Sequence, residues 1–147
     1  MQGTVNAWAS KAGVALAQKK VDFKETCEIN VFKELVGILD VKNCIVTMDA
    51  AGCHAQTLNT VIAGEGDYCV GLKKNQKAIY RNAEALFGRN ECDIDFFETS
   101  NKGHGREETR KYFSLNVDKD FQYNLENKWK KRKQEPFLNI KSVTKVI

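Results

Sequence analysis

The sequence has little proline and no arrangement of cysteines that suggests a disulfide framework or a bound zinc ion. Its 147 residues include one proline, Pro136, and five cysteines. The cysteine count is odd and no two cysteines form a C-x-x-C pair, so neither a disulfide scaffold nor a zinc knuckle is indicated. We interpret the cysteines as reduced, small hydrophobic residues of a cytoplasmic protein.

Long apolar runs are also missing. No charged segment followed by an apolar stretch opens the chain, as a secretory leader requires, and no run approaches the roughly 18 apolar residues of a membrane helix. There is no internal repeat and no low-complexity linker. These absences predict a soluble protein without a membrane partner, of a length that suits one ordinary domain with its own core.

Positively charged residues outnumber negatively charged residues only slightly. The 23 lysines and arginines exceed the 19 aspartates and glutamates, which gives a formal net charge of +4. Such a balance is compatible with a polyanionic partner, and it is also common among proteins that never bind nucleic acid. Net charge alone therefore leaves both classes open.

The first half of the sequence alternates between the patterns of strands and helices. Residues 4–9 and 14–23, separated by the turn-like Lys11-Ala12-Gly13, predict an antiparallel hairpin. A helix is predicted next, with Asn30 as its N-cap, from the spacing of Phe32, Leu35, Val36 and Leu39.

A strand–helix–strand–helix pattern follows the first predicted helix. Residues 44–48 and 68–72 are apolar enough for strands covered on both faces, and as parallel neighbours they require a right-handed crossover. The crossover helix would bury Leu58, Val61 and Ile62 and end at Gly64 and Gly66. Residues 75–87 predict another helix, closed by Gly88.

The second half carries weaker signals. Residues 95–99 and 108–117 resemble polar-faced strands around the turn-like residues 101–105. A basic run at residues 128–133 follows, and residues 137–147 predict a last strand after a break at Pro136.

Asp49 ends the apolar run CIVTMDAAGCH and is followed by small residues. Ligands of open α/β sheets gather at the carboxyl ends of parallel strands. The aspartate could cap the next helix, bind a ribose hydroxyl, or join other carboxylates around a divalent metal. A glycine-rich loop about 20 residues earlier, which ribose binding requires, is missing. We interpret the nearby His54 as a first-turn helix residue and not as a ligand.

Six blocks of the sequence point to a family. In order they are VNAWAS, GVALAQKKVDFKETCEI, ELVGILDVKNCIVTMDAAGC, DYCVGLKKNQ, KGHGREETRKY and FLNIKSVTKV. Together they resemble the H-repeat-associated branch of bacterial insertion-sequence transposases, members of the DDE superfamily with a ribonuclease-H-like fold. The resemblance covers nearly the whole chain in consistent order, so it is more specific than any single motif.

The resemblance implies an α/β protein, a ribonuclease-H-like mixed sheet with a β-rich insertion. In such a family a central strand bears the first catalytic aspartate, a hairpin, a helix and a strand ending in the second aspartate follow, and a late helix carries the catalytic glutamate. Asp49 matches the second aspartate. Only MQGT precedes Val5 and the chain stops at Ile147, so the first central strand and the final catalytic helix are expected to be missing.

Two segments follow from this interpretation. Residues 1–88 are expected to form a partial ribonuclease-H-like catalytic core, and residues 89–147 a β-rich insertion leading toward the missing C-terminal part of that core. The chain would then be a fragment with one catalytic acid of three. The unpaired strand edges left by the missing strand predict self-association.

Glu108, in the block GHGREETR, could substitute for the missing third acid. Arg106 and Arg110 flank it, so the carboxylate could pair with arginine as well as bind a metal. The resemblance places the block before the catalytic helix, so we do not expect Glu108 to be the third acid. His104, Arg106 and Arg110 are candidates for contacts with DNA phosphate, against the alternative of a solvated charged hairpin.

Other candidates for DNA binding are basic or polar. Lys73 and Lys74, with the following Asn75 and Gln76, match a family block at the end of the strand neighbouring Asp49, where lysines would offset phosphate charge. The basic run at 128–133 could act in the same way, with Trp129 available for stacking, although a charge run is usually a solvated face.

The function implied by the resemblance is transposition of an insertion element. Metal-dependent hydrolysis at the element ends gives a 3′ hydroxyl, which then attacks target DNA, and Asp49 would ligate Mg²⁺ or Mn²⁺. The chain alone is expected to be inactive. The alternatives are a non-catalytic DNA-binding or interaction remnant, and a nuclease that completes its site from Glu108, Asp67 or Asp22.

Overall fold

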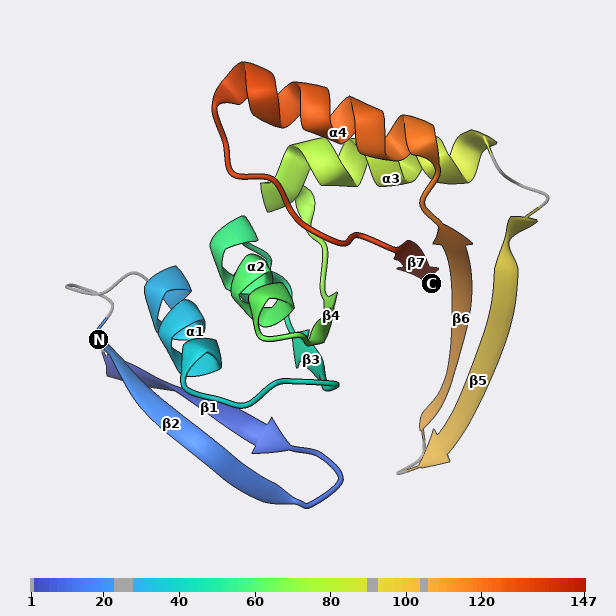
Figure 1. Ribbon diagram of the computed structural model, residues 1–147. Helices are drawn as coiled ribbons and strands as arrows, with labels where there is room; N and C mark the ends of the chain where they lie inside the picture. The colour runs from blue at the N-terminus through green and yellow to red at the C-terminus, as the bar shows by residue number, and fades with distance from the viewer. Residues whose placement is uncertain (1, 23–27, 90–92, 104–105) are drawn as a thin grey trace. The chain divides into compact units, whose positions relative to one another are not determined.

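The computed structural model describes residues 2–22, 28–89, 93–103 and 106–147 of this α/β chain. Within them lie four α-helices and three small sheets (Figure 1). The chain divides into two compact units. The first unit comprises Met1–Lys74 and Glu135–Asn139, and the second comprises Asn75–Gln134 and Ile140–Ile147. None of the described helices is long and apolar enough to cross a membrane.

The first unit opens with the predicted hairpin, which the structure confirms. Strands β1 (Gln2–Ala9) and β2 (Val14–Asp22) pair antiparallel. Gly13 makes the turn with φ 66°, and its N–H donates to the Ala9 carbonyl over 2.8 Å. A positive φ is far easier for glycine than for other residues, so this position suits the turn that the sequence predicted.

Helix α1 (Glu28–Gly37) contacts the hairpin through β2. It buries Val31, Leu35 and Val36, as its apolar spacing predicted. The prediction that Asn30 caps this helix is wrong, because the helix begins at Glu28 and Asn30 is its third residue. Apolar spacing identifies the buried face of a helix and does not locate its first turn.

Strands β3 (Ile45–Met48) and β4 (Asp67–Val70) confirm the predicted parallel pair. The prediction that both faces are covered is wrong, since Ile45 is 70% exposed. Only the face with Val46 and Met48 packs against a core cluster, formed by Val36, Val41 and Val61. In the described ranges no third strand joins this sheet, and every second residue of both strands is exposed. Self-association through its edges stays a prediction.

The crossover between these strands contains a 3₁₀ turn, η1 (Ala50–Gly52), and helix α2 (Ala55–Ala63). Leu58 and Val61 are fully buried, and α2 ends at Gly64 as predicted. Gly66, just before β4, is buried where a Cβ atom would lie 2.7 Å from the Val41 carbonyl oxygen. A side chain there would clash with backbone, so this position needs glycine.

A late segment of the sequence returns to the first unit. The Asn59 side chain donates to the Glu135 carboxylate over 3.0 Å and to the Pro136 carbonyl over 2.9 Å, and it accepts from the Leu138 N–H over 3.0 Å. The Tyr68 hydroxyl donates to the Leu138 carbonyl over 2.6 Å. Residues 135–139, part of which was predicted as a strand, are therefore held by side chains and not by a strand ladder.

In the second unit two helices pack together, α3 (Lys77–Arg89) and α4 (Lys119–Arg132) (Figure 1). A 3₁₀ turn, η2 (Lys74–Gln76), precedes α3. The prediction that Gly88 ends the first of these helices is wrong, since α3 continues to Arg89 and Gly88 lies inside it. A Cβ at Gly88 would meet no atom within 4 Å, so this glycine has no steric role. Helix α4 was not predicted.

The remaining strands form an antiparallel sheet in the order β5-β6-β7. Their bounds are β5 (Asp95–Gly103), β6 (Arg106–Asn116) and β7 (Ser142–Val146). The predicted hairpin is confirmed, and the last strand is shorter than residues 137–147. Cross-strand aromatic pairs support the hairpin, with ring centroids 5.2 Å apart for Phe96–Phe113 and 6.0 Å apart for Phe97–Tyr112.

Candidate functional site

Asp49 follows β3 directly, in extended backbone with φ −75° and ψ −177°. Its Oδ1 accepts a hydrogen bond from the Ala51 N–H over 3.0 Å, and its side chain is exposed to solvent. The aspartate therefore caps the 3₁₀ turn η1 and not helix α2. The N-cap of α2 is His54, which makes no capping side-chain hydrogen bond. The prediction that His54 lies in the first helical turn is thus off by one residue.

The chain after β4 lies against the chain that carries Asp49. The Gly71 N–H donates to the Met48 carbonyl over 3.1 Å, and a Cβ at Gly71 would lie 3.1 Å from the Ala50 nitrogen. Gly71 lets the two backbones approach at the carboxyl ends of the parallel strands. Gly71 was not among the residues predicted for the site, although a glycine directly after a predicted strand is a recognisable signal.

Lys73 and Lys74 are the third and fourth residues after β4, and both are exposed. They belong to the same unit as Asp49. Asn75 and Gln76 belong to the second unit, and the Asn75 side chain accepts from the Gln76 N–H over 3.0 Å. Contacts of these four residues with DNA stay a prediction.

Burial keeps two ionisable side chains of the first unit, Cys53 and Tyr68, protonated and neutral. Burial raises the pKa of the Cys53 thiol to about 11. Burial also raises the pKa of Tyr68 to about 12, with smaller contributions from the charges of Cys53 and Asp67. Neither side chain is ionised near neutral pH, so neither supplies an anionic metal ligand or a nucleophile there.

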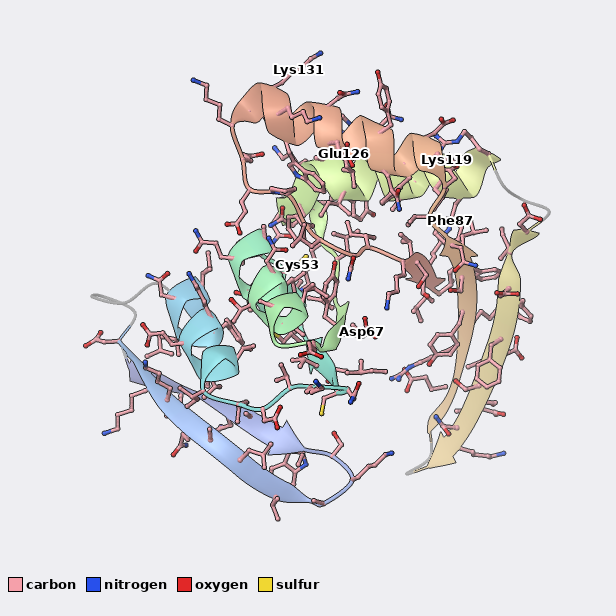
Figure 2. The ribbon with its side chains drawn as sticks, in the orientation of Figure 1. Cys53, Asp67, Phe87, Lys119, Glu126 and Lys131 are labelled. Atoms are coloured by element: carbon pink, nitrogen blue, oxygen red, sulfur yellow. The ribbon has the colours of Figure 1, made fainter. Side chains whose placement is uncertain are left out.

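The described residues do not assemble the metal site that the resemblance implies. They contain no group of three or more His, Cys, Asp or Glu side chains that could hold an ion. Asp67, labelled in Figure 2, pairs with Ile45 at the amino end of the sheet, opposite to Asp49. Asp22 ends β2 in the hairpin. Mg²⁺ prefers about six oxygen ligands, so the single carboxylate of Asp49 does not make a magnesium site on its own.

Glu108 lies on β6 and is paired with arginine, which was one of the two alternatives that the sequence left open. Arg110 donates to its Oε1 from Nη2 over 3.0 Å and from Nε over 3.2 Å. The hydrogen bond and the charge of Glu108 raise the pKa of Arg110. His104 lies outside the described residues, as does the side chain of Arg106. The role of these residues in DNA binding is not tested by these contacts.

The predicted basic run lies at the end of α4. The idea that Trp129 is available for stacking is wrong, because its side chain is only 7% exposed and belongs to the buried face of the helix. Its neighbours Lys130 and Lys131 are exposed. The structural signal that sequence reasoning missed is the spacing of Phe121, Leu125 and Trp129 at every fourth position.

Comparison with known proteins identifies relatives. The chain is 33% identical over 129 residues to "Putative transposase YncI" of Escherichia coli O157:H7, covering 86% of this chain and 33% of that protein. It is 32% identical over 116 residues to "H repeat-associated putative transposase YbfD" of Escherichia coli K12, covering 77% of this chain and 46% of that protein. The chain thus spans less than half the length of these curated relatives. No family model matches it, and no solved structure matches it.

Proposed function

This chain is a relative of the H repeat-associated transposases, and from that premise we propose that it serves in DNA transposition of an insertion element, as part of a DDE-type transposase. The names of its relatives support the family. The position of Asp49 supports the chemistry, because this exposed carboxylate stands at the carboxyl end of a parallel strand, where α/β sheets gather their ligands.

The proposed role of Asp49 is that of the second catalytic aspartate. Its Oδ1 accepts the Ala51 N–H, and no other hydrogen bond to this carboxylate occurs in the described part of the chain, so Oδ2 stays available to a cation. Lys73 and Lys74 would offset phosphate charge nearby. Mg²⁺ or Mn²⁺ would require further carboxylates, which the described residues do not bring together.

A ribonuclease-H-like core is proposed for residues 1–88. The order of elements supports it, since a hairpin, a helix and a strand ending in Asp49 follow one another as the resemblance implies. In this proposal residues 89–147 are the β-rich insertion, and the sheet β5-β6-β7 belongs to it. Glu108 is a poor third acid, because Arg110 already holds one of its carboxylate oxygens.

A non-catalytic role as a DNA-binding or interaction protein is the second candidate. It is favoured by the absence of a group of three metal ligands within the described ranges. The transposase candidate and a DNA-binding remnant both expect DNA as the partner, and they differ in whether Asp49 takes part in cleaving it.

A strand-cleavage assay tests the proposal. Purified chain is incubated with Mn²⁺ and a labelled duplex beside the variants Asp49→Ala and Glu108→Ala. We expect none of the three proteins to cut DNA, because one carboxylate cannot hold two ions. Cleavage that both substitutions abolish would instead establish Glu108 as the partner of Asp49. Failure of the wild-type chain to bind duplex DNA at low salt would contradict both candidates.

A further inference from the structure

The net charge of the chain is concentrated in one short segment. Residues 119–133 contain six cations and two carboxylates, so their formal charge is 6 − 2 = +4. The whole chain also has a formal net charge of +4, and the rest of the molecule is therefore neutral in sum. A surface with this charge distribution attracts anions at one place and not over the whole protein.

Helix α4 holds these cations in a fixed orientation. Phe121, Leu125 and Trp129 are 0%, 1% and 7% exposed and form the buried face of the helix. The start of α4 is fixed as well, because Asp118 caps it and accepts from Arg89 of α3. The remaining faces of α4 are consequently directed away from the core of the second unit.

The exposed side chains of α4 include several cations and one aromatic residue. Lys119, Tyr123 and Lys130 lie on the face opposite the buried one, and Tyr123 is 66% exposed. Lys131, Arg132 and Lys133 are exposed at the carboxyl end. Figure 2 labels Lys119 near one end of α4 and Lys131 near the other. At 1.5 Å per residue these two positions are about 18 Å apart along the axis.

The helix dipole accounts for only part of this arrangement. Cations are favoured in the last turn of a helix, but Lys119 stands in the first turn, where the dipole disfavours it. Like charges at i and i+3 or i+4, as in Lys128 with Lys131 and Arg132, repel each other. Among the described residues no ion pair involves any of these four cations. A polyanion would relieve this repulsion.

We propose that the exposed face and the basic carboxyl end of α4 bind the phosphate backbone of duplex DNA without reading its sequence. The choice of DNA among polyanions rests on the proposed function. Phosphate contacts from lysine and arginine supply most of the sequence-independent affinity of DNA-binding proteins, and this affinity falls steeply with salt. The exposed Tyr123 adds a hydroxyl that can reach a phosphate or a sugar.

The test compares two variants that lose the same charge. One is Lys130→Gln, Lys131→Gln, Arg132→Gln on α4, and the other is a control that replaces three exposed lysines of the first unit, Lys11, Lys20 and Lys33, with glutamine. Glutamine keeps a good helix propensity. Affinity for two short duplexes of unrelated sequence is measured by fluorescence anisotropy at several salt concentrations, after circular dichroism has shown that both variants keep the wild-type fold.

We expect the α4 variant, and not the control variant, to lose affinity for duplex DNA. Losing three phosphate contacts should make the slope of log affinity against log salt less steep by about 2.7 for both duplexes. The control should change this slope by less than about 0.9, the value expected for one phosphate contact. Equal losses in the two variants would overturn the assignment of α4 while leaving DNA as the partner. A wild-type chain that binds neither duplex would overturn the assignment and the DNA partner of the proposed function together.

Discussion

Replacing Asp118 with alanine is expected to destabilise the pair of helices that carries the basic surface. Asp118 is the N-cap of α4, where its Oδ1 accepts from the Phe121 N–H over 2.6 Å. Both carboxylate oxygens also accept from Arg89 of α3, over 3.3 Å and 3.1 Å. The Asp118 side chain thus accepts a hydrogen bond from a backbone N–H in the first turn of α4 and also joins α4 to α3.

The magnitude can be worked from these two contacts. Losing an N-cap side chain costs about 1 kcal/mol of the free energy of unfolding. The Arg89–Asp118 pair is partly exposed, with side-chain exposures of 39% and 35%, so its contribution is about 0.2–1 kcal/mol. Asp118→Ala should therefore cost about 1–2 kcal/mol, whereas Asp118→Asn keeps the capping oxygen and should cost less than about 1 kcal/mol.

Denaturant unfolding followed by tryptophan fluorescence measures these differences. The chain has two tryptophans, and Trp8 is 61% exposed while Trp129 is 7% exposed. Most of the emission change on unfolding therefore reports the core of the second unit. The expected order of stability is wild type, then Asp118→Asn, then Asp118→Ala. An alanine variant as stable as the asparagine variant would show that the cap contributes nothing, and would refute the reasoning.

Two further outcomes follow from glycine packing and from buried acids. Gly66→Ala should lower the free energy of unfolding by about 1–3 kcal/mol, because the added Cβ meets the Val41 carbonyl. Gly37→Ala should be neutral or slightly stabilising, because no atom lies within 4 Å of the added Cβ. Equal effects of the two substitutions would contradict the packing at Gly66. Burial raises the pKa of Cys53 from 9.0 to about 11 and the pKa of Tyr68 from 10.0 to about 12. As the pH rises the unfolded state therefore loses these protons before the folded state does, so the free energy of unfolding should fall above about pH 9. A free energy of unfolding that is constant from pH 8 to pH 11 would contradict this.

Much of the fold of the first unit could be predicted from its sequence, because local chemistry decides it. Lys11-Ala12-Gly13 fixes a turn, and the apolar run before Asp49 fixes a strand. The exposure of Ile45 could not be predicted, since an unbroken apolar run does not say whether a second layer is present to cover it.

Helix α4 was missed because its polar composition hides three apolar residues. Between Phe121, Leu125 and Trp129 stand amide and charged side chains, and the basic run was interpreted by charge alone. The structure shows that the tryptophan inside that run faces the core. Residues 135–139 could not be placed either, because they depend on the Asn59 side chain, 76 to 79 residues away in the sequence.

The position of Asp49 followed from its place after an apolar run, but the capping alternative assigned it to the next helix, whereas it caps the short turn η1 that precedes that helix. What the sequence could not show is the close approach of Gly71 to Ala50, which depends on the parallel register of β3 and β4. The same register separates Asp67 from Asp49.

The most direct test of the central claim compares two aspartates that share one local geometry. Asp40 and Asp49 are both exposed, and each accepts from the N–H two residues later, over 3.2 Å and 3.0 Å. In a Mn²⁺ titration followed by amide NMR, the account predicts that residues 50–53 broaden at lower Mn²⁺ concentration than residues 41–43, and that Asp49→Asn abolishes this difference while keeping the cap. Equal broadening at the two aspartates would show that the strand end gives Asp49 no preference for a divalent cation, and would contradict the claim that this position favours one.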